Sequence, residues 1–165
     1  MNRFLIITIA ILLLSCTETG ISPEDRDFNI LFRYGVGARN ELDTFQNTFT
    51  KDLISDGTVT VSLVLSEAEL HAIQSKLQQS DFFSYPDTFR VDVKDTVRYI
   101  EPHSTFYFRV KTGSNIKTLY WDDWIIPSRA DTLRENLRVI VSFILDLISR
   151  KPEILNLPPA RGGYL

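Results

Sequence analysis

Cysteine and histidine are scarce in this sequence. Its 165 residues include one cysteine, Cys16, and two histidines, His71 and His103. A single cysteine excludes an internal disulfide and any metal site built from several cysteines. Two histidines disfavour a zinc site of the usual type with three histidine ligands. The sequence therefore predicts a domain stabilised by its hydrophobic core, with no metal and no other cofactor.

An excess of basic charge is also missing. There are 18 lysines and arginines against 21 aspartates and glutamates, which gives a net charge of −3. Binding to nucleic acid normally needs a basic patch, and so does adhesion to anionic lipid head groups by charge alone. We therefore expect neither kind of partner. Hydrophobic residues make up 44% of the chain, enough to form a core.

The N-terminal apolar run is too short to cross a bilayer. It extends from Phe4 to Leu14, is interrupted only by Thr8 and follows the basic Arg3. A spanning helix needs about 20 residues. A basic start followed by a short apolar stretch is typical of a cleaved signal peptide. The sequence thus predicts an exported protein.

Leu13-Leu14-Ser15-Cys16 follows this run and resembles the bacterial lipobox. The resemblance implies cleavage between Ser15 and Cys16 and a diacylglycerol thioether on Cys16. Each buried CH₂ group contributes ~0.8 kcal/mol, so two or three chains anchor a protein stably. The alternatives are an uncleaved anchor or an ordinary secretory signal with an incidental cysteine. We expect a protein of the cell envelope, anchored by lipid to a bacterial membrane and facing the periplasm or the exterior.

Four segments follow from these patterns. We expect a signal peptide over 1–15, a lipidated cysteine with its tether over 16–27, one domain over 28–151, and an irregular tail over 152–165.

The domain has the pattern of an α+β fold. Strand composition and turn residues predict an antiparallel sheet of about five or six strands, with two helices packed on it in the order βββα-(β)-ββα. The strands are expected at 28–34, 44–54, 58–65, 105–111 and 116–121, with a short edge strand near 89–93, and the helices at 67–79 and 129–150.

Three local signals define boundaries within this pattern. Asp56-Gly57 is typical of a hairpin turn. Ser66 and Glu69 have the spacing of a capping box, and Ser128 is a candidate N-cap of the second helix. The remainder of 87–103 is expected to be a loop, and it is longer than a connector in a compact domain needs to be.

Some polar residues could carry chemistry if the fold brought them together. Carboxylates and an imidazole at Glu101, His103, Asp122 and Asp123 could bind a metal or serve a hydrolase. No Gly-x-Ser-x-Gly motif accompanies them. The plainer interpretation of Asp122-Asp123 is a turn that ends a strand. We therefore assign no catalytic and no metal-binding residue.

Trp121-Asp122-Asp123-Trp124 suggests a second possibility. Two indoles with polar neighbours could form a platform on which a sugar stacks. The alternative is that both indoles pack in the core. Together with the charged 87–103 segment, this corner is the predicted binding surface, comprising Tyr99, Glu101, His103, Trp121, Asp122, Asp123 and Trp124.

Several segments resemble a group of small bacterial lipoproteins without an established activity. They are Tyr34-Gly35-Val36-Gly37, Asn40-Glu41-Leu42-Asp43-Thr44-Phe45, Thr48-Phe49-Thr50-Lys51-Asp52, Phe82-Phe83-Ser84-Tyr85-Pro86 and Leu119-Tyr120-Trp121-Asp122-Asp123. The resemblance covers most of 28–125. It implies export and a domain that begins near residue 28, and it implies no catalytic residue.

These observations favour a non-catalytic domain, attached to the membrane by lipid on Cys16, that binds an unidentified protein or polymer of the envelope. Two alternatives remain open. One is a small anchored hydrolase that acts on an envelope substrate. The other is an inhibitor of a secreted enzyme, which would present the 87–103 segment from a rigid scaffold.

Overall fold

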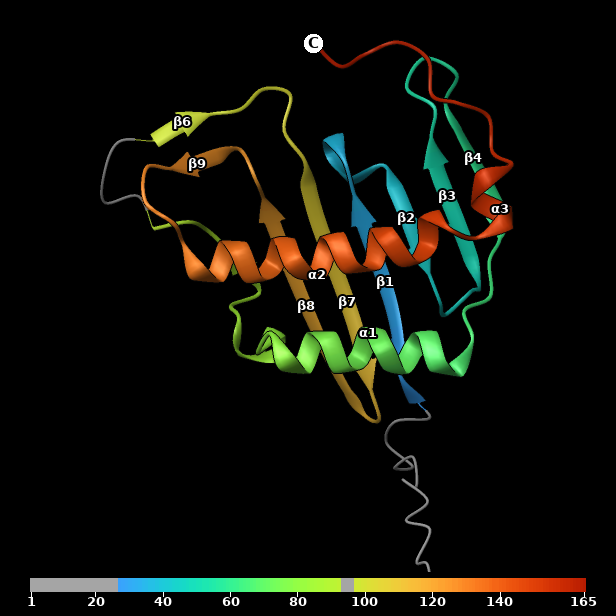
Figure 1. Cartoon of the computed structure of the whole chain (residues 1–165), viewed down its shortest axis with the longest axis horizontal. Helices are drawn as coiled ribbons and strands as arrows, with labels where there is room; N and C mark the ends of the chain where they lie inside the picture. The colour runs from blue at the N-terminus through green and yellow to red at the C-terminus, as the bar shows by residue number, and fades with distance from the viewer. Residues whose placement is uncertain (1–26, 93–96) are drawn as a thin grey trace, which may run out of the picture.

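The protein is an α+β domain in which two long helices cover one face of a seven-stranded sheet (Figure 1). Its computed structural model describes residues 27–92 and 97–165. The expected signal peptide, Cys16 and residues 17–26 of the expected tether lie outside the described residues. No helix in the described part of the chain is long and apolar enough to cross a membrane.

The strand order of the main sheet is β4-β3-β2-β1-β7-β8-β5. All neighbouring pairs are antiparallel except β5 and β8, which are parallel. The bounds are β1 Asn29–Tyr34, β2 Asn40–Asp43, β3 Thr48–Asp52, β4 Thr58–Ser62, β5 Thr88–Phe89, β7 Thr105–Thr112 and β8 Asn115–Asp122. A separate two-stranded sheet pairs β6, Val97–Tyr99, with β9, Ile125–Pro127.

The two faces of the sheet differ in chemistry. Side chains that alternate toward the helices are apolar and buried, among them Phe32, Phe108 and Trp121, each 0% exposed. The intervening side chains form the open face, for example Arg33, Tyr107 and Tyr120, which occupy paired positions of β1, β7 and β8. Because successive side chains of a strand point to opposite faces, one alternating sequence builds both the core and an open, polar surface.

Helix α1, Glu67–Gln79, begins as the sequence predicts. The Ser66 hydroxyl accepts a hydrogen bond from the Glu69 backbone N–H at 3.3 Å, and the Glu69 carboxylate accepts one from the Ser66 N–H at 2.8 Å. Ile73 and Leu77 of this helix are buried against the sheet. The capping box is thus confirmed.

Helix α2, Thr132–Ser149, begins later than predicted. Its N-cap is Asp131, whose carboxylate accepts a hydrogen bond from the Arg134 N–H at 2.9 Å, and not Ser128. Pro127 is still paired with Val97 in the small sheet. The chain leaves that sheet only at Pro127, and residues 128–130 connect it to the N-cap Asp131, so the helix begins three residues later than expected. Leu137, Ile140 and Ile144 are buried, as their spacing predicts.

The predicted strand over 44–54 is wrong in its first part. Residues 44–47 form a turn between β2 and β3, and β2 itself was not expected. The Asp43 carboxylate accepts hydrogen bonds from the N–H groups of Phe45 and Gln46, at 2.8 and 3.1 Å. Such a side-chain cap competes with strand pairing and favours the turn.

The sheet therefore has seven strands where five or six were expected, and its edge strand β5 pairs with β8 in parallel. Residues 97–99 of the expected 87–103 loop form β6, while 93–96 lie outside the described residues. The tail is less irregular than expected. It begins with helix α3, Pro152–Leu155, and Arg161 later pairs with Ile54 in a parallel bridge.

Candidate functional site

The end of β8 separates the two tryptophans. Trp121 points toward the helices, is 0% exposed and stacks on Phe106 with ring centroids 4.9 Å apart. Trp124 follows the end of the strand and is 42% exposed. The core interpretation therefore applies to Trp121, and only Trp124 is available to a partner.

The neighbouring aspartates are separated in the same way. Asp123 lies on the helix side and is 5% exposed. It forms ion pairs with Arg134 at 2.7 Å and with Arg138 at 2.9 Å. Asp123 thus fastens α2 to the end of β8, which is a structural role. It does not belong to the exposed surface on which the sequence placed it.

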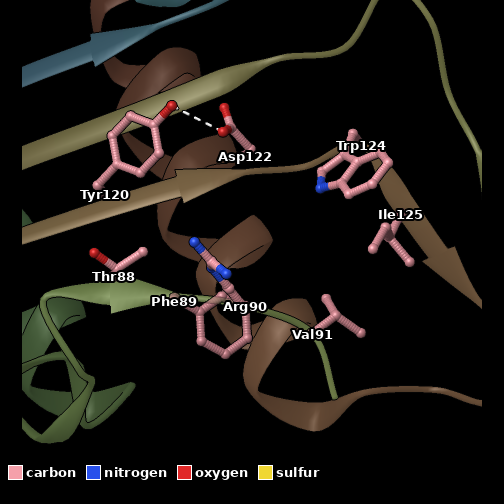
Figure 2. A pocket seen from close by; sticks show the side chains of 8 residues that line it. All are labelled: Thr88, Phe89, Arg90, Val91, Tyr120, Asp122, Trp124 and Ile125. Carbon is pink, nitrogen blue, oxygen red and sulfur yellow. Dashed lines mark hydrogen bonds between the residues drawn. The ribbon is translucent and has the colours of Figure 1, made fainter. Parts of the chain in front are cut away.

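Asp122 lies on the open face and is held in place by two hydroxyl groups. It accepts a hydrogen bond from Thr105 Oγ1 at 2.7 Å. It accepts a second from the Tyr120 hydroxyl at 2.8 Å (Figure 2). This hydrogen bond to a carboxylate, together with burial and the negative charge, raises the pKa of Tyr120. Tyr120 therefore stays protonated at neutral pH and keeps Asp122 oriented.

Trp124 also has a stacking partner from the 87–103 segment. The Tyr99 ring lies parallel to the indole, with centroids 5.1 Å apart and an angle of 23° between the planes. The pairing of β6 with β9 brings them together, and the Ile100 N–H donates a hydrogen bond to the Trp124 carbonyl at 2.9 Å. Tyr99 is 65% exposed. The predicted neighbourhood of this segment and the tryptophan corner is thus present.

A cleft opens beside Trp124, where β5 ends. Beyond Phe89 the chain diverges from β8, and a cavity of about 490 Å³ lies between the two (Figure 2). We call it the Trp124 cleft. It is lined by Thr88, Phe89, Arg90, Val91, Tyr120, Asp122, Trp124 and Ile125. The lining combines an indole, a phenol, a carboxylate, a guanidinium and aliphatic side chains, the mixture found in ligand sites.

Arg90 is a member of this cleft that the sequence did not reveal. Its guanidinium projects into the opening between Thr88 and β8 (Figure 2). Within the described residues it forms no ion pair. Tyr120 was overlooked too. One arginine in a mixed-charge segment gives no signal, whereas Tyr120 could have been found from its position two residues before Asp122.

Glu101 and His103 lie close to each other, and His103 lies near Asp122. His103 Nδ1 is 3.2 Å from Glu101 Oε2, and His103 Nε2 is 3.8 Å from Asp122 Oδ1. His103 nevertheless lines a different cavity, of about 350 Å³, together with Asp123 and Arg138. Asp122 lines the Trp124 cleft, so these two cavities divide His103 from Asp122. Among the described residues no group of three or more potential ligands is arranged to hold a metal.

Comparison of the sequence with models of protein families, and with curated proteins, finds no match. The functional argument therefore rests on the residues and the geometry described above.

Proposed function

We propose that this chain is an exported protein, anchored by lipid on Cys16, that binds a partner in the bacterial envelope through the Trp124 cleft without catalysing a reaction. The lipobox-like residues support the anchor, and the proposal places the chain among small lipoproteins of the kind that its segments resemble. The partner is a protein or a polymer of the envelope.

One observation carries the binding proposal. The Trp124 and Tyr99 rings form an exposed stack at the border of a cleft that also holds the Arg90 side chain. Exposed aromatic rings and arginines are the residues that most often anchor partners. A rigid pair held by β6 and β9 loses little conformational entropy when a partner binds. Such a surface suits recognition.

The position of the cleft agrees with anchoring at the N-terminus. The described chain enters β1 at Asn29, next to Lys111 of β7, whereas β9, which directly follows Trp124, lies toward the opposite end of the sheet (Figure 1). A tether that joins the domain at Asn29 would leave the cleft pointing away from the membrane. Confinement there raises the effective concentration of the domain, so a weak contact can suffice.

The decisive experiment compares two exposed aromatic residues of similar exposure. Trp124 is 42% and Phe83 is 40% exposed, and Phe83 does not line the Trp124 cleft. The full-length protein and its Trp124→Ala and Phe83→Ala variants are cross-linked in intact cells, and the adducts are quantified. We expect Trp124→Ala to lose the adduct and Phe83→Ala to keep it. Equal adducts from both variants would contradict a binding role of the cleft.

The hydrolase alternative is tested in parallel. The same protein is assayed with esterase, peptidase, glycosidase and phosphatase substrates, with His103→Ala and Asp122→Ala as controls. We expect no turnover. Turnover that both substitutions remove would replace the binding role with an enzymatic one.

A further inference from the structure

A second cavity adjoins the Trp124 cleft on the open face of the sheet. It measures about 400 Å³ and is lined by Leu31, Arg33, Gly37, Ala38, Tyr107, Arg109 and Tyr120. Tyr120 lines both cavities. The two hollows therefore share the Tyr120 side chain, and together their linings extend across β8, β7 and β1. We call the two together the open-face groove. Its length suits a linear polymer better than a single small molecule.

Aromatic rings mark the path of this groove. Tyr107 and Tyr120 are directly paired across β7 and β8. Directly paired side chains on one face lie about 4.5–5.5 Å apart at their Cβ atoms. Trp124, with Tyr99 stacked on it, lies farther along the same side. Flat rings in a row offer successive platforms for flat, partly apolar units, such as the faces of sugar rings.

The charge of the groove is opposite to that of the whole chain. The residues that line it include three arginines, Arg33, Arg90 and Arg109, and one carboxylate, Asp122. The chain as a whole has a net charge of −3. The concentration of arginines on this face is therefore local and favours an anionic ligand.

Two of these arginines have no carboxylate partner among the described residues. Glu41 forms an ion pair with Arg33 at 2.5 Å. The Arg109 guanidinium instead lies over the Phe45 ring, 5.3 Å from its centroid, and Arg90 projects into the cleft. An unpaired guanidinium on a surface can bind a carboxylate through two parallel hydrogen bonds.

Asp122 completes the set as a hydrogen-bond acceptor. Two hydroxyl groups of the protein orient it, as described above, and it lines the groove beside Tyr120. A carboxylate in this position would repel a second carboxylate and accept hydrogen bonds from hydroxyl groups. A ligand that carries both acidic groups and hydroxyl groups fits Arg90 and Asp122 at the same time.

The geometry points to a linear acidic polysaccharide, a chain of sugar rings bearing carboxylates, as the ligand of the open-face groove. This inference rests on the proposed binding function and specifies its partner. One sugar ring stacks on Trp124 with its carboxylate on Arg90 and a hydroxyl on Asp122. The chain then crosses Tyr120, and a later carboxylate reaches Arg109.

The test uses the full-length protein in detergent micelles and measures dissociation constants by calorimetry. The probes are a galacturonic acid hexamer, its methyl-esterified form, galacturonic acid itself and a hexaglutamate peptide. We expect the acidic hexamer to bind best and to weaken as salt is raised. The esterified hexamer has the same rings without charge, and the peptide has the charge without rings.

The variants separate the parts of the groove. We expect Arg90→Gln and Trp124→Ala to weaken binding of the hexamer by about tenfold or more, the effect of losing one charge-assisted contact or one anchor. Arg109→Gln should weaken the hexamer and leave the single sugar unchanged, because only a longer chain reaches it. Arg150→Gln is the matched control, since Arg150 pairs with Asp146 on α2, away from the open face.

Each contrary outcome has a distinct meaning. Equal binding of the esterified hexamer, or stronger binding of the peptide, would overturn the acidic polysaccharide. Absence of sugar binding, with an envelope adduct that Trp124→Ala still removes, would overturn this inference and leave the proposed binding function intact. If sugar binding is absent and Trp124→Ala also leaves the envelope adduct unchanged, both this inference and the proposed binding function are contradicted.

Discussion

Arg134 and Asp123 form a buried ion pair, with Nε and Oδ1 2.7 Å apart and each side chain 4% exposed. One residue earlier in the chain, Asp122 faces the open side of the sheet and lines the Trp124 cleft. The pleat of β8 thus places one aspartate in the framework and its neighbour in the candidate site.

This alternation predicts that two similar substitutions destabilise the domain to different extents. Asp123→Asn should destabilise the domain by about 3 kcal/mol, the lower end for breaking a buried ion pair. It removes the buried carboxylate that pairs with Arg134 and Arg138, while Arg134 keeps the exposed Glu135 at 3.0 Å. Asp122→Asn should cost no more than about 1 kcal/mol, since the side chain is partly exposed and an amide oxygen can still accept one hydroxyl bond. Urea unfolding of both variants measures the difference. Equal losses would show that Asp122 is also part of the framework.

The two tryptophans predict a similar contrast. Trp121→Ala should cost about 3–5 kcal/mol, the usual result of emptying a large core site. Trp124→Ala should cost less than about 1.5 kcal/mol, the value of one aromatic stack with Tyr99. Melting temperatures compare the two. A strongly destabilised Trp124→Ala would mean that the corner supports the fold, and binding experiments with it would then need Trp124→Phe.

Helix α2 supplies a prediction about the core. Leu137 and Ile144 are 0% exposed, whereas Val139 of the same helix is 51% exposed. Leu137→Ala and Ile144→Ala should each lower the free energy of unfolding by about 2–5 kcal/mol. Val139→Ala, the matched control, should change it little. Unchanged melting temperatures for both buried positions would contradict the packing of α2 on the sheet.

Alternating and helical patterns were enough to predict most of the fold. The capping box at Ser66, the Asp56-Gly57 turn, the β7–β8 hairpin and the buried stripe of α2 depend on neighbours in sequence, and such signals are visible in one chain. The parallel pairing of β5 with β8 and the pairing of β6 with β9 depend on segments about 30 residues apart. Their partners could not be read from either segment alone.

The candidate site could be predicted only in part, because local sequence patterns identify some of its residues and long-range strand pairing supplies the others. Tyr99, Asp122 and Trp124 were selected because polar and aromatic residues gather near the end of a strand, and the structure brings them together. Trp121 and Asp123 were placed there too, although the strand continues through Asp122 and its alternation turns both inward. If the alternation of side chains had been followed to the end of the strand, Trp121 and Asp123 would have been assigned to the core side and Asp122 to the open face. Arg90 enters the site only through the β5–β8 pairing.

The capping box of α1 predicts a dependence of stability on pH. Burial alone would raise the pKa of Glu69, but hydrogen bonds from Lys151 and Ser66 outweigh it and lower the pKa below its usual value. A carboxylate with a lowered pKa stabilises the fold at neutral pH, and this contribution is lost as the pH falls through the folded-state value. Glu69→Gln should therefore destabilise the protein by about 1 kcal/mol at pH near 7 and by less at acidic pH. Thermal melts of the native protein and of Glu69→Gln across this pH range measure the difference in stability. A difference that grows toward acidic pH would contradict the prediction.

The last prediction concerns the anchor, on which the placement of the binding surface depends. Cys16→Ser should abolish acylation, because the serine hydroxyl cannot form the thioether, and should leave an unprocessed or mislocalised precursor. Fractionation with a carbonate wash and labelling with a fatty acid analogue measure both effects. Cys16 is not among the residues that form the sheet or the groove, so the variant should keep the melting temperature of the native protein and its affinity for the ligand of the open-face groove. Only its membrane attachment and its cross-linking in cells should be lost, because confinement raises the effective concentration near the partner. A variant that is still labelled with lipid and still held by the membrane would show that Cys16 is not the anchor.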